Sequence, residues 1–266
     1  MSSIALGCVV GGSHITTCLV DLDRREIIKG SLFRRRVDSH GTPEDIIDSW
    51  AGCIKESIAL SHNVNRIGIA MPGPFDYDAG ISLIRGLNKY ESLYGLNVKD
   101  LLSVSLGLNA SDILMKNDAG CFLQGEVFSG AARDCKKAFG IALGTGFGSG
   151  VSEDEIAEDG EFWRIPFQND IAENHFSTRW FIKRYQELSG KYVAEVKDLV
   201  DKVSSDSLVQ LIFDEFSENL GAFLLERMME HHPDVIVYGR NVTNAANLFL
   251  PPLAQFFSLR NVGVQL

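Results

Sequence analysis

The sequence predicts an α/β fold that is duplicated, with two similar lobes around a cleft. The chain has 266 residues, enough for two modest domains that each bury a core. A Gly11-Gly12 turn joins two short runs of β-forming residues, and the glycine-rich segment 144–150 joins another such pair. Helical and strand-like segments alternate after both turns, as in α/β proteins. The duplication is inferred from this order of elements, and the cleft between the lobes is the expected ligand site.

The first half is expected to form an antiparallel meander, followed by helices that alternate with strands. Thr42 offers an N-cap, Pro43 a proline at the first helical position and Asp45 an acid three residues past the cap, so a helix should begin there. Apolar residues continue at helical spacing behind this start. The predicted segments are strands over 4–9, 15–22, 26–33, 66–71 and 113–116 and helices over 46–61, 98–106 and 119–128.

The second half repeats that order of elements. Two strands flank a glycine turn, helices follow, and a strand of the buried type leads to a last helix and a closing strand. The predicted segments are strands over 138–143, 148–152, 235–238 and 261–266 and helices over 171–188, 195–203, 208–230 and 244–257. The expected domains are therefore residues 1–117 and 118–266.

The charge balance and the hydropathy exclude two classes of partner. Lys and Arg number 25 against 35 Asp and Glu, which gives a net charge of −10 and argues against nucleic-acid binding. The run Arg34-Arg35-Arg36 is the local exception and is typical of a solvated strand end. No apolar run reaches about 18 residues, so no membrane span is expected.

The cysteines and the first residues indicate the compartment. The five cysteines are scattered, with no C-x-x-C pair, which indicates free thiols in a reducing environment. The start of the chain lacks the charged and apolar regions of a signal peptide. We therefore expect a cytoplasmic protein.

Three glycine turns are candidates for phosphate binding. They are Gly11-Gly12-Ser13, the segment 144–150 and Gly239-Arg240. Glycine lets backbone N–H groups approach an anion closely, and the hydroxyls of Ser13 and Thr145 add donors. The alternative is that the glycines only provide hairpin geometry. Four glycines within seven residues, matched by a glycine turn in the other half, favour phosphate binding.

Asn117-Asp118 is the best candidate for catalysis. An acid at the carboxyl end of a strand and at the start of a helix faces the ligand crevice of an α/β sheet. Asp118 could there accept a proton from a substrate hydroxyl that attacks phosphorus. The alternative is that Asp118 only caps the helix that follows.

These motifs together resemble those of a known family. Their set and order are similar to those of ROK-family sugar kinases and repressors, over about residues 4–264. The motifs are Gly11-Gly12-Ser13, Pro72-Gly73-Pro74-Phe75-Asp76, Asn117-Asp118-Ala119, Gly144-Thr145-Gly146-Phe147-Gly148 and Pro233-Asp234-Val235-Ile236-Val237-Tyr238-Gly239. The resemblance implies the actin/hexokinase-like fold, with two ribonuclease H-like lobes and ATP between them.

The resemblance also implies roles for individual residues. Asp118 corresponds to the base that deprotonates the sugar hydroxyl. The implied sugar ligands are Asn88, Asn117, Glu161 and Glu173. The implied nucleotide- and phosphate-binding residues are Gly11, Gly12, Ser13, Gly144, Thr145, Gly146, Gly239 and Arg240.

The chain departs from the family pattern at several positions. Val9 stands where the family has an acid that helps to hold the metal with its phosphates, and an isopropyl group cannot ligate hydrated Mg²⁺. Arg164 replaces a histidine that binds sugar and zinc, and the zinc cysteines are absent, so no metal-ligating residue and no structural zinc is expected. Arg240 breaks a glycine pair near the nucleotide. The chain also ends at Leu266, before the family's last helix.

The resemblance implies an ATP-dependent sugar kinase that uses ATP and Mg²⁺ to phosphorylate a hydroxyl of a hexose or related sugar. A homodimer is the assembly it suggests. The alternative is a catalytically weak or inactive sugar- or nucleotide-binding regulator, because Val9 argues against a fast enzyme. A DNA-binding repressor is not expected, since the first strand begins at Ile4. A purely structural subunit is a third alternative, against which Asn117-Asp118 argues.

Overall fold

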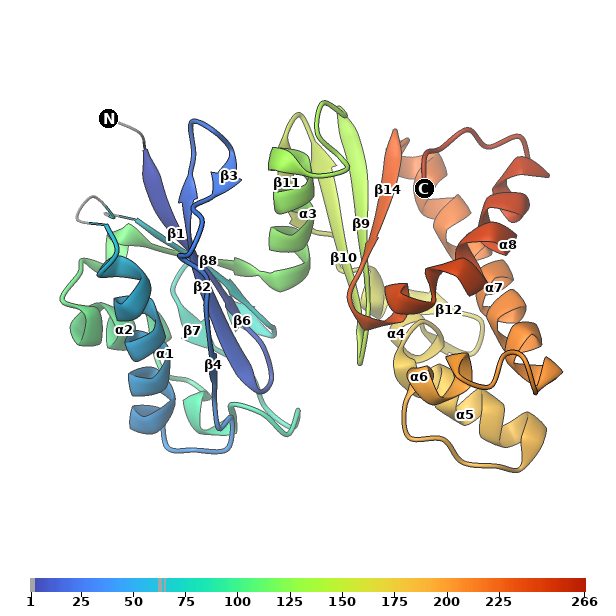
Figure 1. The fold of residues 1–266 in the computed structure, drawn as a ribbon, viewed down its shortest axis with the longest axis horizontal. Coiled ribbons are helices and arrows are strands. Elements are labelled where there is room, and N and C mark those ends of the chain that lie inside the picture. The colour runs from blue at the N-terminus through green and yellow to red at the C-terminus, as the bar shows by residue number, and fades with distance from the viewer. Residues whose placement is uncertain (1–2, 62–63, 65) are drawn as a thin grey trace. The chain divides into compact units, whose positions relative to one another are not determined.

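Two β-sheets with separate hydrophobic cores organise the chain (Figure 1). The computed structural model describes residues 3–61, 64 and 66–266. In it the chain divides into two units, Met1–Asp118 and Ala119–Leu266. Each unit is described by itself below.

The sheet of the first unit has the strand order β3-β2-β1-β5-β8, and β4 pairs with β2 as well. β1 and β2 form an antiparallel hairpin, whereas β5 and β8 continue the sheet in parallel. The strands are β1 (Ile4–Val10), β2 (His14–Asp21), β3 (Glu26–Ile27), β4 (Phe33–Arg36), β5 (Ile67–Met71) and β8 (Ile113–Asn117), with a small separate pair β6 (Phe75–Asp76) and β7 (Ile81–Ser82).

Two helices cover one face of this sheet. α1 (Pro43–Ile58) begins at the predicted capping box, in which the Thr42 side chain accepts from the N–H of Asp45. Trp50 of α1 is fully buried in the core of this unit. α2 (Val98–Leu106) spans the predicted range and ends at Gly107, whose φ of 68° is the left-handed conformation typical of a helix end.

The sheet of the second unit repeats the pairing pattern of the first. Its order is β11-β10-β9-β14, in which β9 and β10 form an antiparallel hairpin and β14 adds in parallel to β9. The strands are β9 (Lys137–Leu143), β10 (Phe147–Glu153), β11 (Ile156–Asp159) and β14 (Val235–Gly239), with a separate pair β12 (Pro166–Phe167) and β13 (Asp170–Ile171). A hairpin followed by a parallel strand therefore occurs in both units, as the predicted duplication requires.

Helices lie on both faces of this second sheet (Figure 1). α3 (Asp118–Ser129) contacts one face through Leu123, and the large aromatic core that includes Phe139 and Phe216 fills the other. The helices on that other side are α4 (Ala172–His175), α5 (Thr178–Ser189), α6 (Val196–Val200), α7 (Ser207–His231) and α8 (Ala246–Ser258).

The strand predicted over 26–33 is wrong as a single element. The structure has β3 and β4, separated by a loop in which Gly30 has a φ of 79°. The buried Ser31 hydroxyl donates to the carbonyl of Ile28 at 2.6 Å and accepts from the N–H of Leu19 at 3.0 Å. A side chain thus satisfies polar groups that a continuous strand would have paired.

Two predictions in the second unit also differ from the structure. The helix predicted over 171–188 is two helices, because Ser177 is extended and the N–H of Thr178 donates to the carbonyl of Gly144 at 2.8 Å. The closing strand predicted over 261–266 is a single parallel bridge between Gln265 and Val235. Val262, Val264 and Leu266 of this segment still pack against the core of the second unit, so the predicted apolar alternation serves packing rather than a ladder.

The cysteines are free thiols, as predicted, and Cys8 and Cys53 are buried. Among residues 3–61, 64 and 66–266, no helix is both long and apolar enough to cross a membrane.

Candidate functional site

The Gly11-Gly12-Ser13 turn lies between β1 and β2. The Gly11 N–H closes it by donating to the carbonyl of His14 at 2.8 Å. Neither glycine has a positive φ. A Cβ on Gly12 would meet only Cδ of Lys89, at 4.0 Å. Neither a positive φ nor crowding therefore requires a glycine at position 12, and the predicted role of this turn in phosphate binding stays a prediction.

Tyr90 joins this turn to the loop that contains Asn88. Its hydroxyl donates to the carbonyl of Gly11 at 2.5 Å, and its ring packs edge-on against Trp50 with ring centroids 5.3 Å apart. Burial raises the pKa of the Tyr90 phenol to about 12, so the hydroxyl remains a donor at neutral pH. Sequence reasoning missed Tyr90, because a buried tyrosine between two loops leaves no local pattern.

The Asn88 loop wraps around one carboxylate. Glu91 Oε1 accepts from the N–H of Leu87 at 2.8 Å and from that of Asn88 at 3.1 Å. The backbone hydrogen bond from Gly86 is the main reason that the pKa of Glu91 is lowered. Asn88 itself has a φ of 55° and an exposed side chain. Hydrogen bonds to Glu91 thus fix the conformation of the loop, and the Asn88 side chain faces solvent.

Asn117 and Asp118 mark the junction of β8 and α3, as the sequence predicts. The Asn117 amide donates to the hydroxyl of Tyr77 at 3.1 Å, and Tyr77 in turn donates to the carbonyl of Met71 at 3.1 Å. A Cβ on Gly73 would lie 3.1 Å from the Tyr77 hydroxyl, so the loop after β5 approaches this group closely. Asn117 and Asp118 are both half-buried. The junction is therefore ordered by its neighbours, and both side chains keep part of their surface exposed.

The glycines of segment 144–150 serve more than one purpose. A Cβ on Gly148 would lie 3.0 Å from Cβ of Ala119, and one on Gly150 would lie 2.8 Å from Cβ of Leu123. These two glycines allow α3 to approach the sheet. Gly144 and Gly146 form the turn itself, in which the N–H of Gly144 donates to the carbonyl of Gly146 at 3.0 Å. Packing against α3 therefore explains Gly148 and Gly150, and only Gly144 and Gly146 remain as candidates for phosphate binding.

Glu173 lies against the same turn. Its Oε2 accepts from the N–H of Phe147 at 3.4 Å, and a Cβ on Gly146 would come within 2.8 Å of that oxygen. Its Oε1 accepts from the guanidinium of Arg179 at 3.0 Å. Thr145 is exposed at the tip of the turn. The structure thus brings together Glu173, predicted as a sugar ligand, with the predicted phosphate-binding residues Gly144, Thr145 and Gly146.

Glu161 forms an ion pair with Arg164, the residue that replaces the family's histidine. Both side chains are exposed, at 47% and 60%. Glu161 has a φ of 50°, and its N–H donates to Asp159 Oδ1 at 2.9 Å. The arginine therefore neutralises a carboxylate that was predicted to bind sugar hydroxyls.

Gly239 and Arg240 follow β14 directly. A Cβ on Gly239 would lie 2.6 Å from Cζ of Phe122, so this glycine is required by α3. The Arg240 side chain lies against the turn that begins at Gly144, with its Cδ 3.6 Å from a Cβ placed on that glycine. Its carbonyl accepts from the hydroxyl of Thr243 at 2.5 Å and from the N–H of Thr243 at 3.1 Å. The predicted nucleotide-side residues Arg240 and Gly144 are thus neighbours.

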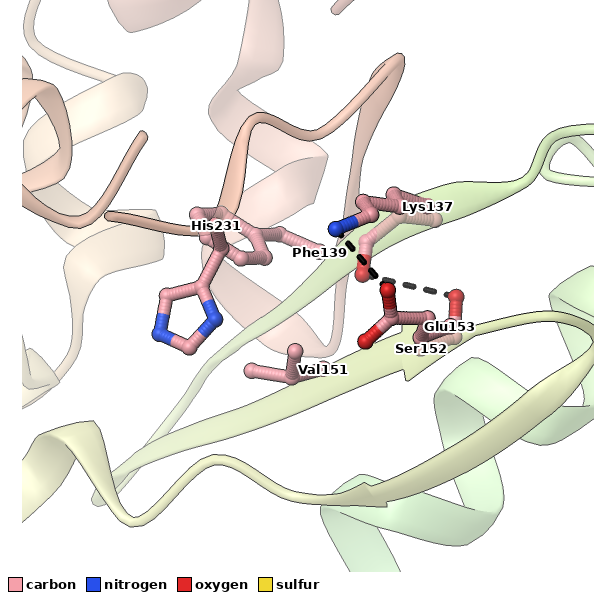
Figure 2. A pocket seen from close by; sticks show the side chains of 7 residues that line it. Lys137, Phe139, Val151, Ser152, Glu153 and His231 are labelled. Atoms are coloured by element: carbon pink, nitrogen blue, oxygen red, sulfur yellow. Dashed lines mark hydrogen bonds and ion pairs between the residues drawn. The ribbon is translucent and has the colours of Figure 1, made fainter. Parts of the chain in front are cut away.

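Two hollows in the second unit lie away from these residues. Figure 2 shows the first, a cavity of about 20 Å³ beside Phe139 and His231, where the ammonium of Lys137 and the carboxylate of Glu153 are 2.9 Å apart. It has room for one water molecule. The other is an open hollow beside Cys135. Neither includes a predicted site residue.

The described residues show no cluster of three or more His, Cys, Asp or Glu side chains that could hold a metal ion. Val9, the residue before the last of β1, is 52% exposed and stands where the resemblance implies an acid. Hard cations require oxygen ligands. The donor set at this strand end therefore does not fit Mg²⁺.

Comparisons with known proteins give the relatives of this chain. A sequence model of the ROK family matches residues 5–162. The chain is 29% identical over 146 residues to the glucokinase of Thermotoga maritima, a match that covers 55% of this chain and 43% of that protein. It is 21% identical over 275 residues to the N-acetyl-D-glucosamine kinase of Pectobacterium atrosepticum, covering 91% and 85% of the two chains.

Solved structures with the same fold include two kinases. A ROK hexokinase from Thermus thermophilus has a TM-score of 0.82 at 16% identity and covers 98% of this chain and 91% of its own. A ROK family glucokinase from Streptomyces griseus, in complex with glucose and AMPPNP, has a TM-score of 0.74 at 21% identity and covers 98% and 90%. These likenesses confirm the predicted α/β fold class of actin/hexokinase type.

Proposed function

The chain belongs to the ROK family, and from this premise we propose that it is an ATP-dependent kinase that phosphorylates a hydroxyl of a hexose or related sugar. The observation that supports the proposal best is the junction of β8 and α3. There Asp118 follows an asparagine that is hydrogen-bonded through Tyr77 to Met71, the last residue of β5. Relatives named glucokinase and N-acetyl-D-glucosamine kinase fit this substrate class.

In the proposed reaction, Asp118 accepts the proton of the sugar hydroxyl. The freed oxygen forms a bond to the γ-phosphorus of ATP, the bond from that phosphorus to the β-γ bridging oxygen breaks, and ADP leaves with the electron pair. General-base assistance of this kind contributes a factor of about 10² to 10⁴ to the rate. Asn88 and Asn117 are proposed to bind sugar hydroxyls.

Glu161 and Glu173 are proposed as further sugar ligands, each with an arginine partner. The guanidinium groups of Arg164 and Arg179 orient these carboxylates and leave lone pairs for sugar hydroxyls. Because each carboxylate is already paired, the sugar pocket is expected to select a different hydroxyl pattern from that of its relatives.

The nucleotide is proposed to bind through three turns. Backbone N–H groups of Gly12 and Gly146 and the hydroxyls of Ser13 and Thr145 donate to phosphate oxygens. Gly11, whose N–H is bonded to the carbonyl of His14, shapes the turn that presents them. Gly144, Gly239 and Arg240 form the nucleotide-side surface of the second unit. Mg²⁺, which the resemblance implies, does not fit the donor set at Val9, so no step is assigned to it.

We also propose a cellular location and an assembly for this protein. Free cysteines suit a reducing compartment, so a cytoplasmic location is proposed. A homodimer is proposed as the assembly, and the two ribonuclease H-like lobes are proposed to correspond to the domains predicted over 1–117 and 118–266.

A phosphorylation screen tests the function. Wild type and Asp118→Asn are incubated with ATP and Mg²⁺ on a panel of hexoses and N-acetylhexosamines, and the sugar phosphate is identified by ³¹P NMR. Wild type is expected to phosphorylate at least one sugar and the variant to lose most of that activity. Absence of turnover on every sugar, or equal turnover by the variant, contradicts the proposal.

A regulatory protein that binds sugar or nucleotide without turnover is the second candidate. The exposed Val9 and the Glu161–Arg164 ion pair favour it, since both alter groups that the family uses for substrates. Saturable sugar binding by calorimetry, with no sugar phosphate formed, would support this candidate over the kinase.

A further inference from the structure

The face of the first sheet that carries Val9 has an unusual set of side chains. Strand partners share a face, and the register places five residues in one row across five strands. From β4 to β8 they are Arg34, Thr16, Val9, Ala70 and Lys116. Arg36, paired with His14, lies on the same face in the next row. We name the row of five, with Arg36 and His14, the Val9 face.

The cations of this face have no acidic partner. Arg34, Arg36 and Lys116 are exposed, and none of them forms an ion pair within residues 3–61, 64 and 66–266. Arg35 points to the opposite face and behaves differently, since its guanidinium lies 2.5 Å from Glu56 Oε1 of α1. Successive side chains of a strand point to opposite faces. The ion-paired Arg35 therefore lies on one face of β4, and Arg34 and Arg36 lie on the other.

The strand residues of this face include no carboxylate; the nearest along the chain are Asp38 and Asp118, just past the ends of β4 and β8. No Asp or Glu occurs among the residues of β1, β2, β4, β5 and β8 that point to it, although the chain has a net charge of −10. Arg34 and Lys116 each lie two strands from Val9, about 10 Å away, which is within reach of long side chains that lean inward. An anion placed over Val9 would therefore meet cations from both sides.

The adjacent turn adds donors to this surface. The Ser13 hydroxyl lies 2.9 Å from Nδ1 of His14, and the Lys89 stem lies beside Gly12. Exposed cations and hydroxyls with no carboxylate bind phosphate oxygens and repel a divalent metal. The replacement of the family's acid by Val9 is thus matched by unpaired cations in the same row.

We propose that the Val9 face binds a phosphate chain directly through Arg34, Arg36 and Lys116, without a divalent metal ion. The ligand class is a linear di- or triphosphate, either inorganic or as the tail of a nucleotide. This inference rests on the phosphate-binding part of the proposed function. Arginine and lysine side chains would contact the phosphates directly, in place of a metal ion held by a carboxylate.

Calorimetric titration in EDTA tests the inference on the full chain. Inorganic tripolyphosphate, ATP and adenosine are the three ligands, and binding is measured at low and high salt and again with Mg²⁺. Wild type is expected to bind the first two in EDTA and not adenosine. Binding of tripolyphosphate but not of ATP would identify an inorganic phosphate chain as the ligand. Tighter binding of ATP than of tripolyphosphate would identify a nucleotide.

Each of the variants Arg34→Gln, Arg36→Gln and Lys116→Gln is expected to weaken phosphate binding about 10-fold. High salt should weaken the binding further.

Two variants serve as controls. Arg24→Gln removes a cation of the same unit whose side chain is 75% exposed and paired with Asp21 and Glu26, and it should bind like wild type. Val9→Asp places a carboxylate on the face, and it should bind poorly in EDTA and recover with Mg²⁺. Binding by wild type only with Mg²⁺, or unchanged binding by all three cation variants, overturns the inference.

The outcome is separable from that of the kinase proposal. Phosphate binding in EDTA without any sugar phosphorylation contradicts the kinase and supports this inference. Phosphorylation by wild type, with unchanged phosphate binding in the three variants, supports the kinase and overturns the inference.

Discussion

Arg240 adopts a backbone conformation that glycine adopts far more readily than arginine. Its φ of 70° and ψ of −169° lie in a region almost restricted to glycine, where another residue costs about 1–3 kcal/mol. Both hydrogen bonds from Thr243 hold its carbonyl in place. Backbone strain of this kind clusters at active sites and ligand-binding segments. The side chain in question lies against Gly144 of the proposed phosphate turn.

Arg240→Gly and Arg240→Ala separate the strain from the side chain. Both remove the guanidinium, but only glycine relieves the backbone. We expect the glycine variant to have a free energy of unfolding about 1 kcal/mol higher than the alanine variant, and both to bind ATP more weakly than wild type. Urea unfolding and calorimetry measure the two effects. Equal stability of the variants, or wild-type affinity for ATP, would contradict this account.

Residues that are placed by the order of strands and helices along the chain could be predicted from the sequence. Asn117-Asp118 was placed at a strand end before a helix, and the structure has it there. The arginine partners of Glu161 and Glu173 lie only three and six residues away. The pairing could still not be predicted, because it depends on the local backbone conformation, such as the φ of 50° at Glu161. Lys116 was missed although it precedes Asn117, since only the register across five strands shows that it shares a face with Val9.

Among the elements, the turn after β1 and the loop with Asn88 are joined by one hydrogen bond. Tyr90 donates it to Gly11. Tyr90→Phe should lower the free energy of unfolding by about 1–2 kcal/mol, because it leaves a carbonyl without its donor. It should also raise KM for both ATP and sugar, because both segments lose their support.

Tyr185→Phe is the matched control for this prediction. Tyr185 is 1% exposed and donates to Asp206 Oδ2 at 2.9 Å in the second unit, where no predicted site residue lies beside it. We expect a similar loss of stability in thermal unfolding with unchanged KM values. If both variants alter KM alike, the coupling through Tyr90 is refuted.

Contact between α3 and the second sheet depends on glycines. A Cβ on Gly150 would lie 3.0 Å from the carbonyl oxygen of Ala119, whereas one on Gly125, on the exposed side of α3, would meet nothing. Gly150→Ala should destabilise by about 1–3 kcal/mol through overpacking. Gly125→Ala should stabilise by up to about 1 kcal/mol, because alanine favours the helix. Denaturant unfolding measures both, and equal signs would contradict the packing argument.

Elements with strong local signals were predicted well. The capping box at Thr42 fixed the start of α1, and the run ending at Gly107 fixed α2. The predictions failed where tertiary hydrogen bonds compete with propensity. Ser31 interrupts the strand predicted over 26–33, and the N–H of Thr178 bonds to Gly144 between α4 and α5. Thr178 and Gly144 are far apart in the sequence, and Ser31 bonds to the N–H of Leu19 on β2 as well as to the nearby Ile28.

On the scale of the whole molecule, the two sheets share one pairing pattern without shared sequence. The sequence order predicted this repeat, because a glycine turn followed by alternating helices and strands occurs twice. The distribution of charge over the faces could not be predicted in the same way. The net charge of −10 hides the cationic Val9 face, which appears only when the strands are in register.

The whole chain is expected to be stable without metal or disulfides. Its five cysteines are free thiols, and the described residues lack a cluster that could hold a metal ion. A structural metal would raise the melting temperature by binding only the folded state. We therefore expect the same melting temperature with and without EDTA or dithiothreitol, measured by calorimetry. A lower value in EDTA would reveal a metal site.

The central claim is that Asp118 is the base of a sugar kinase, and Asp118→Asn tests it most directly. Asp118 is the first residue of α3, and asparagine has nearly the same size without the basic carboxylate, so the fold is retained while the base is removed. The account predicts unchanged melting temperature and ATP affinity, and a kcat for the phosphorylated sugar that is at least about 100-fold lower than that of wild type. A variant that turns over as fast as wild type would contradict it.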